Sequence, residues 1–152
     1  MKTRAVLRLL ACWLLAAACA STPSGSANEP EIRIVQLPAS EFVAELHGAV
    51  SIAYQLTVRN RMSETITLRQ VEMQTLDRSP YALRNTPATF DEIIEPGKEA
   101  VVIFEMWAEP RPGKAAKVNT VWIQGTAEFE SSKGGRFRTA FTRYFLEPKR
   151  GG

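Results

Sequence analysis

The chain offers few of the side chains that enzymes use for catalysis. It has one histidine, His47, and two aspartates, Asp77 and Asp91. A serine hydrolase needs a serine, a histidine and an acid in one arrangement, often within a G-x-S-x-G motif, and the chain lacks this motif. It also lacks the H-E-x-x-H zinc motif, the Walker phosphate loop and the EF-hand calcium loop. The sequence therefore predicts a protein that is not an enzyme and that holds no cofactor and no metal ion.

Two weaker candidates for chemistry do not change this prediction. Paired glutamates can hydrolyse glycosidic bonds, but glutamates are spread along the chain and no pair stands out. His47 precedes Gly48, which allows a turn, so we expect a turn or surface histidine rather than a metal ligand.

The first twenty residues carry a signal that concerns location. Lys2, Arg4 and Arg8 precede an uncharged run over residues 9–20. A charged start before a short apolar stretch is typical of a secretory signal. The run has 12 residues, whereas a membrane-spanning helix needs roughly 20. Because the signal has no Arg-Arg pair, we expect the general secretory route rather than the twin-arginine route.

The end of this signal, Ala16-Ala17-Ala18-Cys19, resembles the lipobox of bacterial lipoproteins. In that family a tripeptide of small residues precedes a cysteine that receives fatty acyl chains, palmitate among them, and becomes the first mature residue. Leu15 stands four residues before the cysteine here, whereas the commonest lipobox has leucine three before. The resemblance implies removal of residues 1–18 and lipidation of Cys19. The alternative is cleavage after Ala18-Cys19-Ala20, an A-x-A site, which would give a soluble periplasmic protein.

The same resemblance implies a destination in the cell envelope. Several acyl chains hold a protein stably at a membrane, whereas one chain holds it only marginally. Ala20 follows Cys19 at the position where aspartate is the family's usual signal for retention in the inner membrane. We therefore expect the periplasmic face of the outer membrane. Residues 19–30, rich in Ser, Pro and Gly, predict a short flexible tether that keeps the domain near this membrane.

Composition narrows the class of partner. The formal charge of +3 comes from 19 basic and 16 acidic residues. Loss of Lys2, Arg4 and Arg8 with the signal leaves 16 basic against 16 acidic residues, so the mature charge does not predict nucleic-acid binding. Cys19 is then the only cysteine, and the domain has no disulfide. Its stability must come from one hydrophobic core, for which about 120 residues suffice.

Alternation of apolar and polar residues predicts the strands. Residues 49–59 show it most clearly, and residues 31–37, 117–130 and 136–146 show it as well. In residues 65–76 the alternation changes parity near Arg69-Gln70, which predicts a β-bulge.

Three other segments are less regular. Residues 100–107 are apolar on both faces, which predicts a central strand covered on two sides. Residues 41–47 form a weaker strand or a bend, and residues 81–90, which include Pro87, are predicted to be irregular.

Seven or eight short strands separated by turns predict an all-β fold. We expect an antiparallel Ig-like β-sandwich over residues 31–147, followed by a polar tail over residues 148–152. Leu56–Asn60 followed by Glu64–Leu68 is similar to the strand, Asn, turn, strand core of late-embryogenesis-abundant type 2 domains, which are Ig-like sandwiches. The chain has Asn60-Arg61-Met62 where that family has Asn-Pro-Asn. The resemblance implies the sandwich fold and, as one possible role, protection under stress.

Aromatic residues on strand faces are the first candidates for a binding surface. Trp122 lies on the mostly polar face of its strand, and exposed large aromatic residues are favoured at binding sites. The alternative is that a loop or the N-terminal segment covers Trp122. Trp107 falls within the strand that is apolar on both faces, so we expect it to be buried. Arg143 interrupts the face formed by Phe137, Phe141 and Phe145, which predicts an ion pair or an exposed strand end.

Charged residues are segregated along the chain. Residues 133–150 hold six basic residues and one acidic residue, and residues 91–109 hold six acidic residues and one basic residue. This pattern predicts cross-strand pairing between the two segments or ordinary solvated faces. The alternative is a cationic patch of Arg136, Arg138 and Arg143 that meets anionic headgroups of lipid or lipopolysaccharide.

The sequence as a whole predicts a non-enzymatic lipoprotein. It would be anchored to a membrane through Cys19 and act as an interaction or accessory module for a protein partner in the cell envelope. Binding would use exposed strand edges or the face that carries Trp122. One alternative is a carrier of a small ligand or lipid, which needs an apolar cavity between the sheets. A stress-protective domain is the other alternative.

Overall fold

The computed structural model describes residues 28–37, 48–76, 79–84, 87–111 and 120–146. Several sequence predictions lie outside these residues, namely those on Cys19, on residues 41–47 with His47, and on the C-terminal tail. None of the described residues forms a helix long and apolar enough to cross a membrane. The described elements are eight strands: β1 (Glu31–Gln36), β2 (Val50–Arg59), β3 (Ile66–Thr75), β4 (Tyr81–Leu83), β5 (Ala88–Ile94), β6 (Glu99–Pro110), β7 (Thr120–Ser131) and β8 (Arg136–Leu146).

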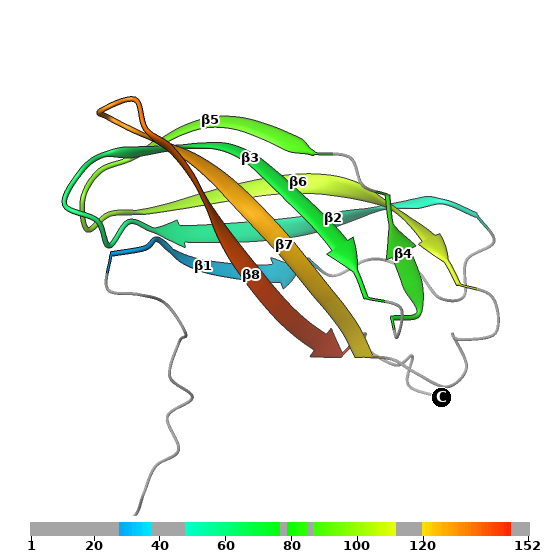
Figure 1. The fold of residues 1–152 in the computed structure, drawn as a ribbon. Helices are drawn as coiled ribbons and strands as arrows, with labels where there is room; N and C mark the ends of the chain where they lie inside the picture. Colours follow the sequence, from blue (N-terminus) through cyan, green and yellow to red (C-terminus); the bar gives the residue numbers. More distant parts are fainter. Residues whose placement is uncertain (1–27, 38–47, 77–78, 85–86, 112–119, 147–152) are drawn as a thin grey trace, which may run out of the picture.

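The strands form two antiparallel sheets that lie one on the other (Figure 1). One sheet has the order β1-β2-β6-β4, and the other has the order β5-β3-β7-β8. The orders β1-β2-β6 and β3-β7-β8 correspond to strands A-B-E and C-F-G of an immunoglobulin-type sandwich. The predicted antiparallel β-sandwich is therefore confirmed, with eight strands.

Alternation along each strand builds the core between the sheets. Of the residues that alternation places on one face of β2, Ile52, Tyr54, Leu56 and Val58 are almost completely buried, whereas Val50 at the start of the strand is half-buried. Strand β7 contributes the inward residues that its sequence predicts, and strand β3 contributes a second set from the same sheet. The buried members of these two strands are Ile66, Leu68, Val71, Met73, Val121, Ile123, Ala127 and Phe129. One hydrophobic core thus runs the length of the sandwich, as expected for a domain without disulfides.

The predicted β-bulge in the third strand is confirmed. The pairing of β3 with both β5 and β7 shifts register between Leu68 and Gln70. The shift explains why Leu68 and Val71 both point inward although they differ in parity. Arg69, at the bulge, forms ion pairs with Asp91 and with Glu130.

The prediction that residues 100–107 are covered on both sides is wrong. Strand β6 is central in its sheet, but its outward residues Val101, Ile103 and Trp107 are 54%, 62% and 53% exposed. Trp107 is therefore not buried as predicted. The apolar residues on both faces of β6 suggested cover on two sides. The prediction failed because no second layer of described residues packs on the outer face of this sheet.

The prediction that residues 81–90 are irregular is wrong as well. Two strands start within this segment: β4 pairs with β6, and β5 pairs with β3. Strand β4 has only three residues, Tyr81–Leu83, too few for a visible alternation. Pro87 precedes β5, a position at the start of an edge strand where proline is tolerated.

Candidate functional site

The outward face of the β3-β7-β8 sheet brings together the most promising binding residues. Successive residues of a strand point to opposite faces, so the even-numbered residues of β7 and β8 in this region point outward. The register pairs Trp122 with Tyr144, Gln124 with Thr142, and Thr126 with Ala140. On the other side of β7, Gln124 pairs with Gln74. These rows form a continuous surface, which we call the β7 face.

An aromatic pair lies at one end of the β7 face. Trp122 is 36% exposed and Tyr144 is 63% exposed, and their ring centroids are 5.0 Å apart with an interplanar angle of 32°. The alternative, in which a loop or the N-terminal segment covers Trp122, concerns residues that lie largely outside the described ranges. Aromatic rings that remain exposed offer a large contact area at low cost in side-chain entropy.

The backbone of Trp122 is held firmly by a connecting segment. Ser79 is completely buried, and its hydroxyl accepts a hydrogen bond from Trp122 N at 2.9 Å and donates one to Trp122 O at 3.2 Å. Leu76 N also donates to Trp122 O at 2.9 Å. Because these bonds fix the start of β7, the aromatic pair is held on rigid backbone rather than on a loop.

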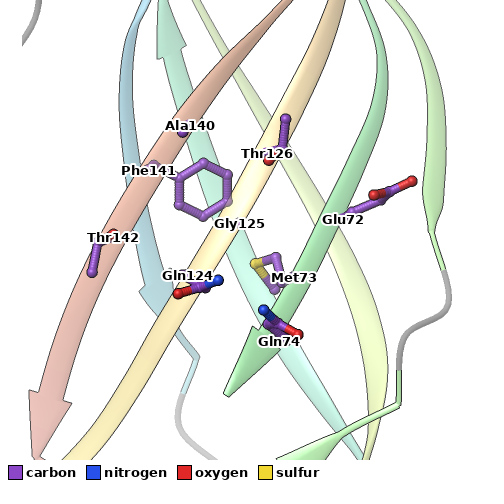
Figure 2. A pocket seen from close by; sticks show the side chains of 9 residues that line it. All are labelled: Glu72, Met73, Gln74, Gln124, Gly125, Thr126, Ala140, Phe141 and Thr142. Carbon is purple, nitrogen blue, oxygen red and sulfur yellow. The ribbon is translucent and has the colours of Figure 1, made fainter. Parts of the chain in front are cut away.

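A shallow hollow lies next to the row of the aromatic pair in the strand register, and Figure 2 shows the residues that line it. It encloses about 360 Å³, and its sides come from outward residues of three strands. Its lining residues are Glu72, Met73, Gln74, Gln124, Gly125, Thr126, Ala140, Phe141 and Thr142. Most of its polar groups are uncharged amides and hydroxyls, which can donate and accept hydrogen bonds.

The floor of the hollow depends on a glycine. Gly125 lies between Met73 and Phe141 in the register, in a row whose side chains point to the core. The ring of Phe141 lies over Gly125, so that a Cβ at this position would be 2.8 Å from Phe141 Cε2 and 2.7 Å from Glu72 O. Gly125 therefore lets an aromatic side chain of the edge strand reach across β7.

Charged residues occupy the other end of the β7 face. Arg138 donates to Glu128, with Nε 2.9 Å from Oε2, and Arg136 lies 3.7 Å from Oε1 of the same carboxylate. Arg136 also lies 3.9 Å from Glu130. These arginines therefore have acidic partners on the adjacent strand, and their charges are largely compensated.

Of the two arrangements expected for the charged segments, pairing between them or ordinary solvated faces, the first is not seen: the described residues show no ion pair that joins residues 133–150 to residues 91–109. Lys133 pairs with Glu64, and the arginines of β8 pair with β7. In the acidic segment, Asp91 pairs with Arg69, and Glu109 pairs with Arg84. Among the described strands, β8 of the basic segment pairs only with β7, whereas the acidic segment lies on β5 and β6, neither of which is next to β8. Arg143 lies near the end of β8 and is exposed, as its position predicted.

The β7 face is suited to recognition. Among the residues that the structure describes, no group of three or more His, Cys, Asp or Glu side chains could hold a metal ion.

The sequence analysis identified Trp122 but missed Tyr144 and the glutamines of the hollow. The short turn between β7 and β8 could have predicted that Tyr144 lies beside Trp122. The length of a hairpin loop sets the strand register, and this register pairs the two residues.

No protein-family model and no curated protein matches the chain. Among solved structures, the structural genomics target SoR45 aligns with a TM-score of 0.55 at 11% identity, over 79% of this chain and 86% of that chain. A protein from Bordetella pertussis assigned as ApaA aligns with a TM-score of 0.56 at 11% identity, over 80% of this chain and 94% of that chain. At such low identity these similarities show the β-sandwich fold and carry no function.

Proposed function

We propose that this protein is a lipid-anchored interaction module of the cell envelope that binds a protein partner through the β7 face. The observation that supports the proposal most directly is the exposed pair of Trp122 and Tyr144 beside the hollow. Tryptophan and tyrosine are enriched among the residues that contribute most to binding energy at protein interfaces. The lipobox-like Ala16-Ala17-Ala18-Cys19 supports the anchor, and the lack of recognisable catalytic motifs supports a role in binding.

The position of the β7 face fits this role. The tether enters the domain at β1, which belongs to the other sheet. The β7 face is therefore on the opposite side of the sandwich from the sheet that follows the anchor. The hollow is lined mainly by polar side chains on an outer face. It therefore supports surface recognition better than the carriage of an apolar ligand between the sheets.

Truncation of the aromatic pair tests the proposal. A photo-cross-linking amino acid at Gln124 is expected to capture a partner in intact cells. The double substitution Trp122→Ala and Tyr144→Ala should then reduce capture strongly, because loss of an aromatic hot spot of about 2 kcal/mol weakens binding roughly thirtyfold.

Trp107 provides a matched control on the opposite outer face. It is an exposed tryptophan as well, at 53%, but it lies in the β1-β2-β6-β4 sheet. Trp107→Ala should leave capture at Gln124 unchanged. If the Trp107 substitution abolishes capture while the Trp122 and Tyr144 substitutions do not, the partner binds the other face and the proposal is wrong.

A further inference from the structure

Strand β8 ends one sheet with a long and regular edge, which pairs with no other strand among the described residues. It has 11 residues and pairs with β7 without any register shift. The other strands at the sheet edges are shorter, with six residues in β1, three in β4 and seven in β5. Natural proteins protect sheet edges with short strands, prolines, bulges or charged residues. Strand β8 is long and has no proline and no bulge, and its charged residues Arg136, Arg138 and Arg143 are the protection it carries. Its edge can therefore pair with a strand that places no like charge opposite these arginines.

The backbone groups at this edge can be assigned from the hydrogen bonds of β7. Leu76 N donates to Trp122 O, so the backbone groups of Trp122 point toward β3. Because this direction alternates along a strand, odd-numbered residues of β7 point their backbone groups toward β8. Odd residues of β7 pair with odd residues of β8, such as Ile123 with Arg143. The backbone groups of the even residues Arg138, Ala140, Thr142 and Tyr144 therefore point to the free edge.

The residue pattern of β8 is complementary to itself. Phe137, Phe141 and Phe145 are placed symmetrically about Phe141. In an antiparallel pair of two β8 strands centred on Phe141, this residue lies opposite its own copy. The same register places Arg138 opposite Tyr144, where a guanidinium can interact with an aromatic face. No residue of β8 then lies opposite a residue of like charge.

Two polar groups on the inward side support this register. Thr139 Oγ1 is buried and has no hydrogen-bond partner among the described residues. Arg143 is exposed, and it makes no hydrogen bond or ion pair with another described residue. Both residues have the inward parity of β8, and the symmetric register places them opposite each other across the new strand pair. An unpaired buried hydroxyl is costly, and a guanidinium is a suitable donor for it.

We propose that two copies of this chain pair through antiparallel β8 strands centred on Phe141, which joins their sheets into one. The axis of such a pair is perpendicular to the joined sheet. Both β7 faces therefore lie on one side of the pair, and both outer faces that carry Trp107 lie on the other. The Arg138 of one copy becomes a neighbour of the Trp122 and Tyr144 pair of the other.

A charge-pairing experiment tests the register directly. Ala140 of one copy lies opposite Thr142 of the other in the proposed pair, and both residues point outward. Ala140→Lys combined with Thr142→Lys places like charges opposite each other twice, whereas Ala140→Glu combined with Thr142→Lys places opposite charges there. Sedimentation equilibrium would be measured on the full chain carrying Cys19→Ser, so that no acyl chain drives association. Thermal unfolding would verify that both variants are folded.

The unsubstituted β8 edge and the Glu/Lys variant should form dimers. The Lys/Lys variant should have a dimer dissociation constant raised about tenfold, because like charges in directly opposed cross-strand pairs are destabilising. The proposal is overturned if the unsubstituted edge leaves the chain monomeric up to its solubility limit, or if the two variants associate equally. It is also overturned if the edge is occupied by a strand of a different protein, which in-cell cross-linking at Thr142 would capture in place of a second copy.

Discussion

At the scale of single residues, the side chain of Asn60 connects several backbone segments through three hydrogen bonds. It is fully buried at the end of β2. Its Nδ2 donates to Glu64 O at 2.8 Å and to Ile94 O at 2.9 Å, and its Oδ1 accepts from Met62 N at 2.9 Å. Asn60 thereby joins the turn after β2 to the end of β5 in the other sheet.

Asn60→Ala should lower the free energy of unfolding by about 3 kcal/mol, because it leaves buried backbone carbonyls and an amide without partners. Chemical denaturation measures the loss. Asn28→Ala is a control of the same residue type at an exposed position, and it should change the stability by less than about 0.5 kcal/mol. An Asn60→Ala protein as stable as the control would show that water satisfies these groups.

In the sequence, only the family resemblance drew attention to Asn60. The buried hydrogen bonds of the Asn60 side chain could not be predicted from the sequence. The bond with Ile94 joins residues that only tertiary packing brings together, whereas the bonds with Met62 and Glu64 are local to the turn. The outward position of Trp122 was predictable, since it follows from alternation within one strand. The burial predicted for Trp107 was wrong, because alternation cannot reveal whether a second layer covers a face.

At the scale of strands, Gly125 allows β3, β7 and β8 to pack as they do. Gly125→Ala should lower the free energy of unfolding by about 1–3 kcal/mol, because the added Cβ meets both the Phe141 ring and the backbone oxygen of Glu72. The loss is measured by chemical denaturation.

Gly135→Ala is the matched control for this substitution. A Cβ at Gly135 would be 3.4 Å from Ser131 Oγ and would meet nothing closer. It should therefore change the stability by less than about 0.5 kcal/mol. Equal effects of the two substitutions would mean that Phe141 and the backbone of β3 move aside at little cost.

Strands with a clear alternation were predictable, whereas the three-residue β4 and the seven-residue β5, whose sequence does not alternate regularly, were not. The bulge near Arg69 was predictable because a bulge shifts the parity of the pattern. Strand β4 could not be recognised, since Tyr81–Leu83 covers barely more than one alternation. Its pairing with β6 depends on contacts between segments far apart in sequence, such as Leu83 with Ala108.

At the scale of the whole molecule, the proposed anchor makes a direct prediction. Cys19→Ser should move the protein from the membrane fraction to the soluble periplasmic fraction, because it removes the thiol that would be acylated. Fractionation followed by immunoblotting measures the shift. Cys12→Ser is the matched control, since Cys12 lies within the expected signal and should leave the distribution unchanged.

If Cys19→Ser protein stays in the membrane fraction under conditions that release peripheral proteins, the lipobox prediction is wrong.

The sandwich architecture was predictable from strand number and spacing. The division of eight strands between two sheets was not, because it depends on which strands pair across long stretches of chain. The β7 face was only partly predictable for the same reason.

The pairing of β2 with β6 has a consequence for how the chain reaches its folded state. Arg59 pairs with Glu99 and Val50 with Ala108, so the two central strands are joined across about 40 to 60 residues. Domains dominated by such distant pairings fold on a timescale of roughly milliseconds to seconds. During this interval the apolar residues of β6 lack their partner strand. A newly made chain is therefore most prone to aggregation before it folds, and the yield of folded protein depends on the time the chain spends unfolded.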